Sequence, residues 1–134
     1  PSIKKLSDLG IQLNITALLT IQQVENTVNV LNSEIFNIIS VFAGRIADTG
    51  LDPKATMKNS KDVISSKLLK TELLWASPRQ ALNILEAEDV GCDIITITPE
   101  LLYKTSNFGK NLDQLSLETV KMFYDDALKA GYTL

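Results

Sequence analysis

Two polar side chains share one face of an expected strand near the start of the sequence. Asn14 and Thr16 lie two positions apart in a run of apolar and β-branched residues, and alternate side chains of a strand point to the same face. A strand covered on both faces is normally apolar throughout, and an amide or hydroxyl buried without a partner costs roughly 1–3 kcal/mol. The pair therefore predicts either a bound ligand or hydrogen bonds to neighbouring side chains, and the sequence leaves both open.

A hydroxyl and a cation lie at the end of the next expected strand. Ser40 lies within the strand, and Arg45 follows the glycine that ends it. Ligands of α/β proteins bind at the carboxyl ends of strands, and the planar guanidinium matches phosphate oxygens. Arg45 is therefore a candidate anion ligand. The alternative is a surface arginine paired with Asp48.

A third polar pair lies in the sequence Trp75-Ala76-Ser77-Pro78-Arg79, where an expected strand gives way to a helix. Backbone N–H groups at a helix N-terminus add to the preference for an anion, although Ser77 could serve only as an N-cap. Together, the polar groups at three successive strand ends predict a mostly neutral pocket that contains two arginines, Arg45 and Arg79. Such a pocket suits a polyhydroxylated substrate that carries one phosphate.

The composition excludes several other kinds of chemistry. The sequence has no histidine, which excludes serine–histidine and cysteine–histidine catalysis within the chain and removes the commonest metal ligand. Cys92 is the single cysteine, so an internal disulfide is excluded. We interpret Cys92 as a small thiol buried in an apolar strand and expect a cytoplasmic location.

The charge balance argues against nucleic acid and membrane partners. The 13 basic and 16 acidic residues give a net charge of −3, and lysine and arginine form no cluster. With 45% hydrophobic and 22% charged residues and no apolar run long enough to cross a bilayer, the composition is typical of a soluble globular protein. Any anion must therefore be held by local contacts.

Strand-like and helix-like stretches alternate along the chain. Strands are expected at residues 11–20, 37–43, 71–76 and 93–98. Helical spacing is expected at residues 3–9, 21–31, around 63–69, from Pro78 to about 90, at 99–103 and at 115–130. Gly10 and Gly91 are expected to end helices, and residues 104–113 are the best loop or linker candidate. We predict one domain over residues 1–134.

This alternation predicts an α/β fold with a parallel sheet and right-handed crossovers. Two architectures fit: an open doubly wound sheet and part of a closed (β/α)8 barrel. A complete barrel needs at least ~200 residues and eight β/α units. This chain supplies about half of those units. The pattern alone favours the open sheet.

Four segments of the chain resemble one known family in order and in spacing. They are residues 10–16, 41–48, 75–79 and 91–102. The family is that of the transaldolases, including its fructose-6-phosphate aldolase-like branch. The resemblance implies that residues 1–134 are the C-terminal half of a (β/α)8 TIM barrel, with a C-terminal amphipathic helix and with the N-terminal half outside this chain.

The resemblance also implies a class I aldolase chemistry that requires no cofactor. A lysine forms a Schiff base with a ketose phosphate, and a dihydroxyacetone unit passes to an aldehyde acceptor. By motif position, Asn14 and Thr16 are similar to the family's catalytic pair, with Thr16 orienting a water. Ser40 and Ser77 are similar to its substrate-binding serines, and Arg45 and Arg79 to its phosphate-binding group.

This sequence departs from the family pattern at Val41, where proline is common, and at Pro78, where a bulkier residue is common. The larger departure is the Schiff-base lysine, which the family carries on a strand before the one with Asn14. Lys4 and Lys5 follow that expected strand in a charged helical segment, so we interpret them as surface residues. This segment by itself is expected to be inactive.

Three functions remain open at this point. The first is a transaldolase of the pentose phosphate pathway, acting on sugar phosphates as a homo-oligomer. The second is a non-catalytic half barrel that binds sugar phosphates or pairs with itself. The third is a fructose-6-phosphate aldolase.

Overall fold

Residues 2–67 and 70–132 are described by a computed structural model of the chain. They belong to two compact units, which divide between Leu102 and Tyr103. The boundary lies close to the predicted linker at 104–113. The first unit holds the sheet and all the candidate site residues.

The first unit alternates helices and strands as predicted, but a short helix at Ala43–Ala47 forms where the sequence predicted the end of a strand and a loop. Its strands are β1 (Asn14–Leu18), β2 (Asn37–Val41), β3 (Thr71–Trp75) and β4 (Ile94–Ile95). Its helices are α1 (Ser2–Asp8), α2 (Ile21–Val28), α3 (Ala43–Ala47), α4 (Lys54–Lys67) and α5 (Leu82–Asp89), and α6 (Pro99–Lys104) crosses into the second unit. The predicted helical positions Leu68 and Leu69 lie outside the described residues.

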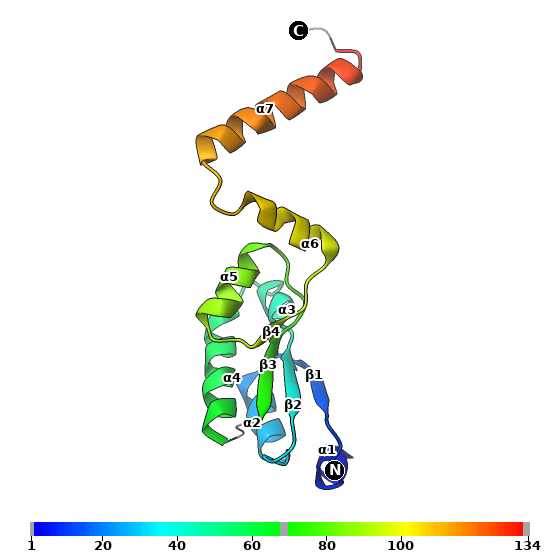
Figure 1. The fold of residues 1–134 in the computed structure, drawn as a ribbon, viewed down its shortest axis with the longest axis vertical. Coiled ribbons are helices and arrows are strands. Elements are labelled where there is room, and N and C mark those ends of the chain that lie inside the picture. The colour runs from blue at the N-terminus through cyan, green and yellow to red at the C-terminus, as the bar shows by residue number, and fades with distance from the viewer. Residues whose placement is uncertain (1, 68–69, 133–134) are drawn as a thin grey trace. The chain divides into compact units, whose positions relative to one another are not determined.

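The order of the strands decides between the two architectures. All pairings are parallel, and the strands lie side by side in chain order, β1-β2-β3-β4, as Figure 1 shows. A doubly wound sheet reverses its strand order at a switch point, whereas a (β/α)8 barrel adds each strand next to the last. The predicted fold class, four β/α units of a (β/α)8 barrel, is therefore confirmed, and the open sheet favoured by the pattern alone is wrong.

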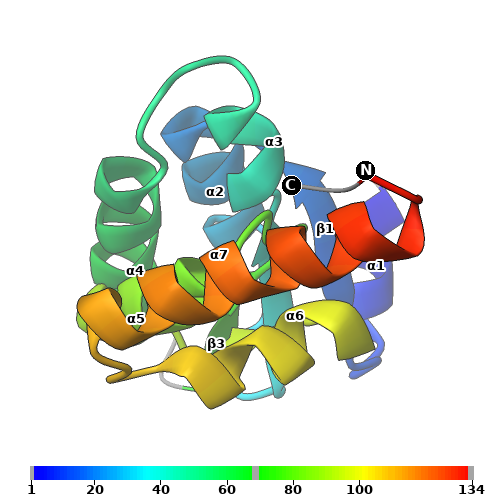
Figure 2. The same ribbon diagram turned by 90° about the horizontal axis from the view of Figure 1, so that it is seen from above.

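The helices α2 and α4 pack on the same side of the sheet, as Figure 2 shows. The core between them contains alternate residues of β2 and β3, namely Ile39, Val41, Leu73 and Trp75, together with Val24, Met57 and Ile64 from the helices. The intervening residues of the strands point to the opposite face. Ser40 lies on this opposite face, which is the interior face of a barrel.

Most predicted boundaries shift by a few residues, and α4 begins at Lys54, well before the predicted 63. Two of the differences have a clear local cause. The fourth strand was expected at 93–98 but pairs only at Ile94–Ile95, because β3 is its single partner among the described strands and ends at Trp75. Pro78 was expected in the first turn of a helix, yet α5 begins only at Leu82. Ser77 has a left-handed backbone, with φ of 58°, which turns the chain away before a helix can start.

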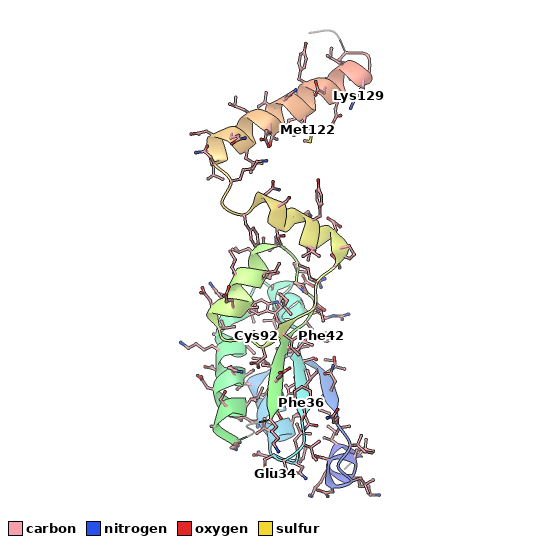
Figure 3. The ribbon with its side chains drawn as sticks, in the orientation of Figure 1. Glu34, Phe36, Phe42, Cys92, Met122 and Lys129 are labelled. Atoms are coloured by element: carbon pink, nitrogen blue, oxygen red, sulfur yellow. The ribbon has the colours of Figure 1, made fainter. Side chains whose placement is uncertain are left out.

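The second unit contains the 3-10 turn η1 (Thr105–Asn107) and the long helix α7 (Leu112–Lys129). Asn111 caps α7, since its side chain accepts hydrogen bonds from the backbone N–H groups of Asp113 at 2.9 Å and Gln114 at 3.1 Å. The predicted C-terminal amphipathic helix is thus found, three residues earlier at its start. Figure 3 labels Met122 and Lys129 along it.

Among the helices of the described residues, none is long and apolar enough to cross a membrane.

Candidate functional site

The carboxyl ends of neighbouring strands are held close together by backbone contacts. Phe42 donates its N–H to the carbonyl of Leu18 at 2.8 Å, and Ala76 donates its N–H to the carbonyl of Val41 at 2.9 Å. Figure 3 shows Phe42 at this end of β2 and Phe36 at the other end. The loops that follow β1, β2 and β3 therefore meet at one edge of the sheet.

Gly44 allows the loop after β3 to approach α3 very closely. An added Cβ at Gly44 would lie 1.5 Å from the carbonyl oxygen of Ser77 and 3.3 Å from Nε of Arg79. The backbone N–H of Gly44 donates to the carbonyl of Ala76 at 3.3 Å. No residue with a side chain fits here without displacing the Ser77 backbone.

Ser77 and Arg79 line a cavity of about 300 Å³ at the carboxyl ends of β3 and β4. The other lining residues are Pro78, Thr96, Ile97 and Thr98. The cavity thus combines a guanidinium with three hydroxyl-bearing side chains. These groups can hold an anion and the hydroxyls that accompany it.

The sequence reasoning missed Thr96 and Thr98. They alternate with Ile95 and Ile97, which is the same signal that drew attention to Asn14 and Thr16. This alternation was not used, because residues 93–98 were interpreted as an ordinary apolar strand.

Arg79 is held in place at both its backbone and its side chain. Its N–H donates to the side-chain oxygen of Asn83 at 2.8 Å, and Asn83 also accepts from Gln80 N–H at 3.0 Å. Asn83 therefore satisfies the N–H groups ahead of α5, and the alternative role of Ser77 as an N-cap is wrong. The Arg79 guanidinium forms a bidentate pair with Asp48, with Nε 3.0 Å from Oδ1 and with Nη2 bonded to Oδ2.

Arg45 is not among the residues that line this cavity. It lies in α3 with its guanidinium carbon 5.5 Å from the centre of the Phe42 ring, a cation–π contact. The alternative in which Arg45 pairs with Asp48 is wrong, because Asp48 pairs with Arg79. None of the ion pairs among residues 2–67 and 70–132 involves Arg45, so its charge is available to a ligand.

Asn14 and Ser40 are brought together across β1 and β2. The Ser40 hydroxyl donates to Oδ1 of Asn14 at 2.7 Å, and Ser40 is only 2% exposed. The sequence left open whether Asn14 binds a ligand or a neighbouring side chain. For its side-chain oxygen, the neighbouring side chain is the partner. Asn14 itself is exposed, so its amide N–H groups can still meet a ligand.

Thr16 lies next to an irregularity in β1. The register with β2 shifts between Ile15 and Leu18, and Ala17 has a φ of 64°. A bulge of this kind re-aims the side chains beside it. Thr16 is exposed, and among the described residues no hydrogen bond joins its side chain to Asn14 or Ser40.

Cys92 is half-buried and packs against the core near the amino end of β4. Burial raises the pKa of its thiol above the ordinary value. Its sulfur lies 3.1 Å from the Leu73 carbonyl oxygen. The predicted role of Cys92 as a small packed thiol is consistent with these contacts.

A larger cavity, of about 470 Å³, lies at the opposite end of the sheet. It is lined by Phe36, Lys61, Ser65, Lys70, Thr71, Glu72 and Asp93. Three of its charged groups already pair, Lys61 with Asp93 at 2.6 Å and Lys70 with Glu34 at 3.4 Å. The smaller cavity is the stronger candidate for a ligand site, because it lies at the carboxyl ends of the strands, where ligands of such folds bind.

In the part of the chain that the structure describes, no group of three or more His, Cys, Asp or Glu side chains is placed to hold a metal ion.

The sequence matches the family described as Transaldolase/Fructose-6-phosphate aldolase over residues 1–134. A probable transaldolase of Nitrosopumilus maritimus is 32% identical over 102 residues, which are 75% of this chain and 44% of that protein. A probable transaldolase of Rhizorhabdus wittichii is 28% identical over 131 residues, 98% of this chain and 56% of that protein. The chain spans about half the length of such curated relatives.

Among solved structures, one titled "Native KDPGal structure" is 16% identical, with a TM-score of 0.32 over 96% of this chain and 65% of that chain. This likeness is too weak to bear on the site.

Proposed function

Since the chain belongs to the Transaldolase/Fructose-6-phosphate aldolase family, we propose that it supplies the phosphate-binding and hydroxyl-binding part of a transaldolase active site. The reaction transfers a dihydroxyacetone unit from a ketose phosphate to an aldose phosphate through a lysine Schiff base. The cavity between Ser77 and Arg79 on one side and Thr96 and Thr98 on the other carries the proposal.

The phosphate is proposed to bind at Arg79, with the Ser77 hydroxyl as a further donor. Both side chains line the same cavity, and the bound anion would be held by charge-assisted hydrogen bonds. Arg45 lies in α3, the short helix that follows the neighbouring strand β2, and has no carboxylate partner among the described residues, which supports it as a second cation for the same phosphate. A net-acidic protein can then hold a dianion by local charge alone.

The sugar hydroxyls are proposed to meet Asn14 and Ser40. The hydrogen bond from Ser40 fixes the Asn14 carboxamide, so its exposed N–H groups are oriented in advance for an oxygen acceptor. Thr16 is proposed to hold the water that moves a proton during bond cleavage and formation. Its exposure leaves the hydroxyl accessible to solvent.

The Schiff-base lysine is proposed to come from a part of the protein outside this chain. Lys4 and Lys5 are in α1, and the Nζ of Lys4 forms an exposed ion pair with Asp8 at 3.1 Å. A solvated, ion-paired ammonium lacks the desolvated surroundings that make a Schiff-base lysine nucleophilic. This supports the interpretation of both lysines as surface residues.

Borohydride trapping tests the reaction type. The full-length protein would be reduced in the presence of fructose 6-phosphate or dihydroxyacetone, and the modified peptide identified by mass spectrometry. We expect one reduced adduct on a lysine outside residues 1–134. If the folded protein forms no reduced lysine adduct, the proposed Schiff-base reaction is contradicted, and a non-catalytic half barrel is favoured.

Replacing Arg79 tests the phosphate assignment. Arg79→Ala should raise KM for fructose 6-phosphate by about 10–100-fold, as expected for losing a charge-assisted bond worth ~1.5–3 kcal/mol. Activity on unphosphorylated dihydroxyacetone should change little. Lys70→Ala is the matched control, because it removes a cation at the other end of β3. Equal losses on both substrates would remove the assignment.

The family description covers fructose-6-phosphate aldolases as well as transaldolases. Transfer to sugar-phosphate acceptors would identify a transaldolase, whereas simple addition of dihydroxyacetone to aldehydes would identify an aldolase. A panel of acceptors with rates measured side by side separates the two. Membership of the pentose phosphate pathway, a cytoplasmic location and a homo-oligomeric state are parts of the same proposal.

A further inference from the structure

We propose that Asp48 is the positioning residue for Arg79: its carboxylate fixes the guanidinium so that the remaining N–H donors grip the substrate phosphate. The proposal rests on the function proposed above and adds a residue to that site. Asp48 comes from the end of α3, and Arg79 from the loop after β3. The pair therefore joins the loops of two neighbouring strands.

The geometry of the pair leaves more than half of the guanidinium N–H donors unused. Nε donates to Oδ1 of Asp48 at 3.0 Å, and Nη2 donates to Oδ2. A guanidinium has five N–H donors, so this side-on pairing uses two of them and leaves three on Nη1 and Nη2. Arg79 can thus hold Asp48 and a phosphate at the same time, the phosphate at its end-on edge.

Both members of the pair stand on fixed backbone. Asp48 ends α3, and its N–H donates to the Gly44 carbonyl at 3.0 Å. Gly44 in turn contacts the backbone of Ser77. The Arg79 N–H is held by Asn83. A long side chain anchored at both its root and its tip loses less freedom when a ligand binds, which raises affinity.

The exposure of the pair separates this role from a structural one. The side chains of Arg79 and Asp48 are 49% and 52% exposed. Ion pairs this exposed contribute little to folding stability. Losing the carboxylate should therefore leave the fold intact and change only how firmly the Arg79 side chain is held in one conformation.

Direct binding of inorganic phosphate tests the proposal without relying on catalysis. The full-length protein would be titrated calorimetrically as wild type, Asp48→Asn and Arg79→Ala. We expect Asp48→Asn to raise Kd for phosphate about tenfold, with an unchanged melting temperature. Asp52→Asn is the matched control, since Asp52 is an acid nearby that pairs with Lys54 and does not touch Arg79. It should bind phosphate like wild type.

Two further measurements address positioning itself. In ¹⁵N NMR spectra, the Nε–H resonance of Arg79 should be resolved and slow to exchange in wild type, and should broaden or shift toward solvent values in Asp48→Asn. In steady-state assays, Asp48→Asn should raise KM for fructose 6-phosphate with kcat nearly unchanged, and should spare dihydroxyacetone. Asp48→Glu, which keeps the carboxylate, should recover part of the affinity.

The outcomes distinguish this proposal from the proposed function. If Arg79→Ala weakens phosphate binding but Asp48→Asn leaves it unchanged or tightens it, Asp48 is a bystander or a competing anion, and the positioning role is overturned. If Arg79→Ala binds phosphate like wild type, or wild type binds none, the phosphate site itself fails and the role of Asp48 falls with it.

Discussion

The close approach of Gly44 to the loop after β3 makes Gly44→Ala the sharpest test of the described structure. An alanine Cβ would lie 1.5 Å from the Ser77 oxygen and 2.6 Å from the Ser77 carbonyl carbon, where ordinary contact is 3.4–4 Å. The two backbone segments would have to separate by about 2 Å. Such a shift would also break the hydrogen bond from Gly44 to Ala76.

The expected cost follows from three opposing terms. Overpacking against backbone costs ~3 kcal/mol at the upper end of its usual range, and the lost hydrogen bond costs ~1 kcal/mol. Gly44 has no left-handed backbone and is in a helix, where alanine is favoured over glycine by ~1 kcal/mol. The net loss of unfolding free energy is then about 3 kcal/mol. Without the close contact, the same substitution would stabilise the protein.

Urea unfolding followed by circular dichroism measures this loss. With a slope of ~1–3 kcal/mol/M, the midpoint should fall by about 1–3 M. Ala47→Gly, at an exposed position of the same helix, is the control and should cost only ~0.5–1 kcal/mol. A Gly44→Ala protein within ~0.5 kcal/mol of wild type would refute the described approach of the two loops.

Three further outcomes are expected. Ser40→Ala should lower the unfolding free energy by ~1–2 kcal/mol, because it removes the donor to Asn14 from a buried site; an unchanged urea midpoint would count against that bond. Since burial raises the pKa of Cys92, its native-state alkylation should be slow at neutral pH and should accelerate only above the ordinary thiol range; labelling as fast as in urea would contradict this. The hydrogen bond from Lys110 lowers the pKa of Glu118, so Lys110→Gln should raise that pKa toward its usual value in an NMR titration, and no change would exclude the contact.

The elements could be predicted where the local pattern and the tertiary fold agree. The strands β2 and β3 begin at the predicted residues Asn37 and Thr71, because buried, β-branched runs have few alternatives. The strand β4 is shorter than predicted because its length depends on a partner strand and not on its own residues. The late start of α5 depends on the left-handed Ser77, which propensity does not reveal.

The site could be predicted by residue type but not by pairing. Ser77 and Arg79 do share a cavity, and Ser40 does reach Asn14, as residues at neighbouring strand ends should. The partner of Asp48 could not be predicted, since Arg45 is close in sequence whereas Arg79 comes from the next β/α unit. The order of the strands also required the structure, because a repeated β/α pattern is common to barrels and doubly wound sheets.

The chain-order arrangement of the sheet has a consequence for how the protein is made. Paired residues are 24 positions apart between β1 and β2 (Asn14 and Ile38) and 34 apart between β2 and β3 (Asn37 and Thr71). Each strand that leaves the ribosome therefore finds its neighbour already synthesised, and only one short crossover separates the two. Among β1 to β4, folding can therefore follow synthesis one β/α unit at a time.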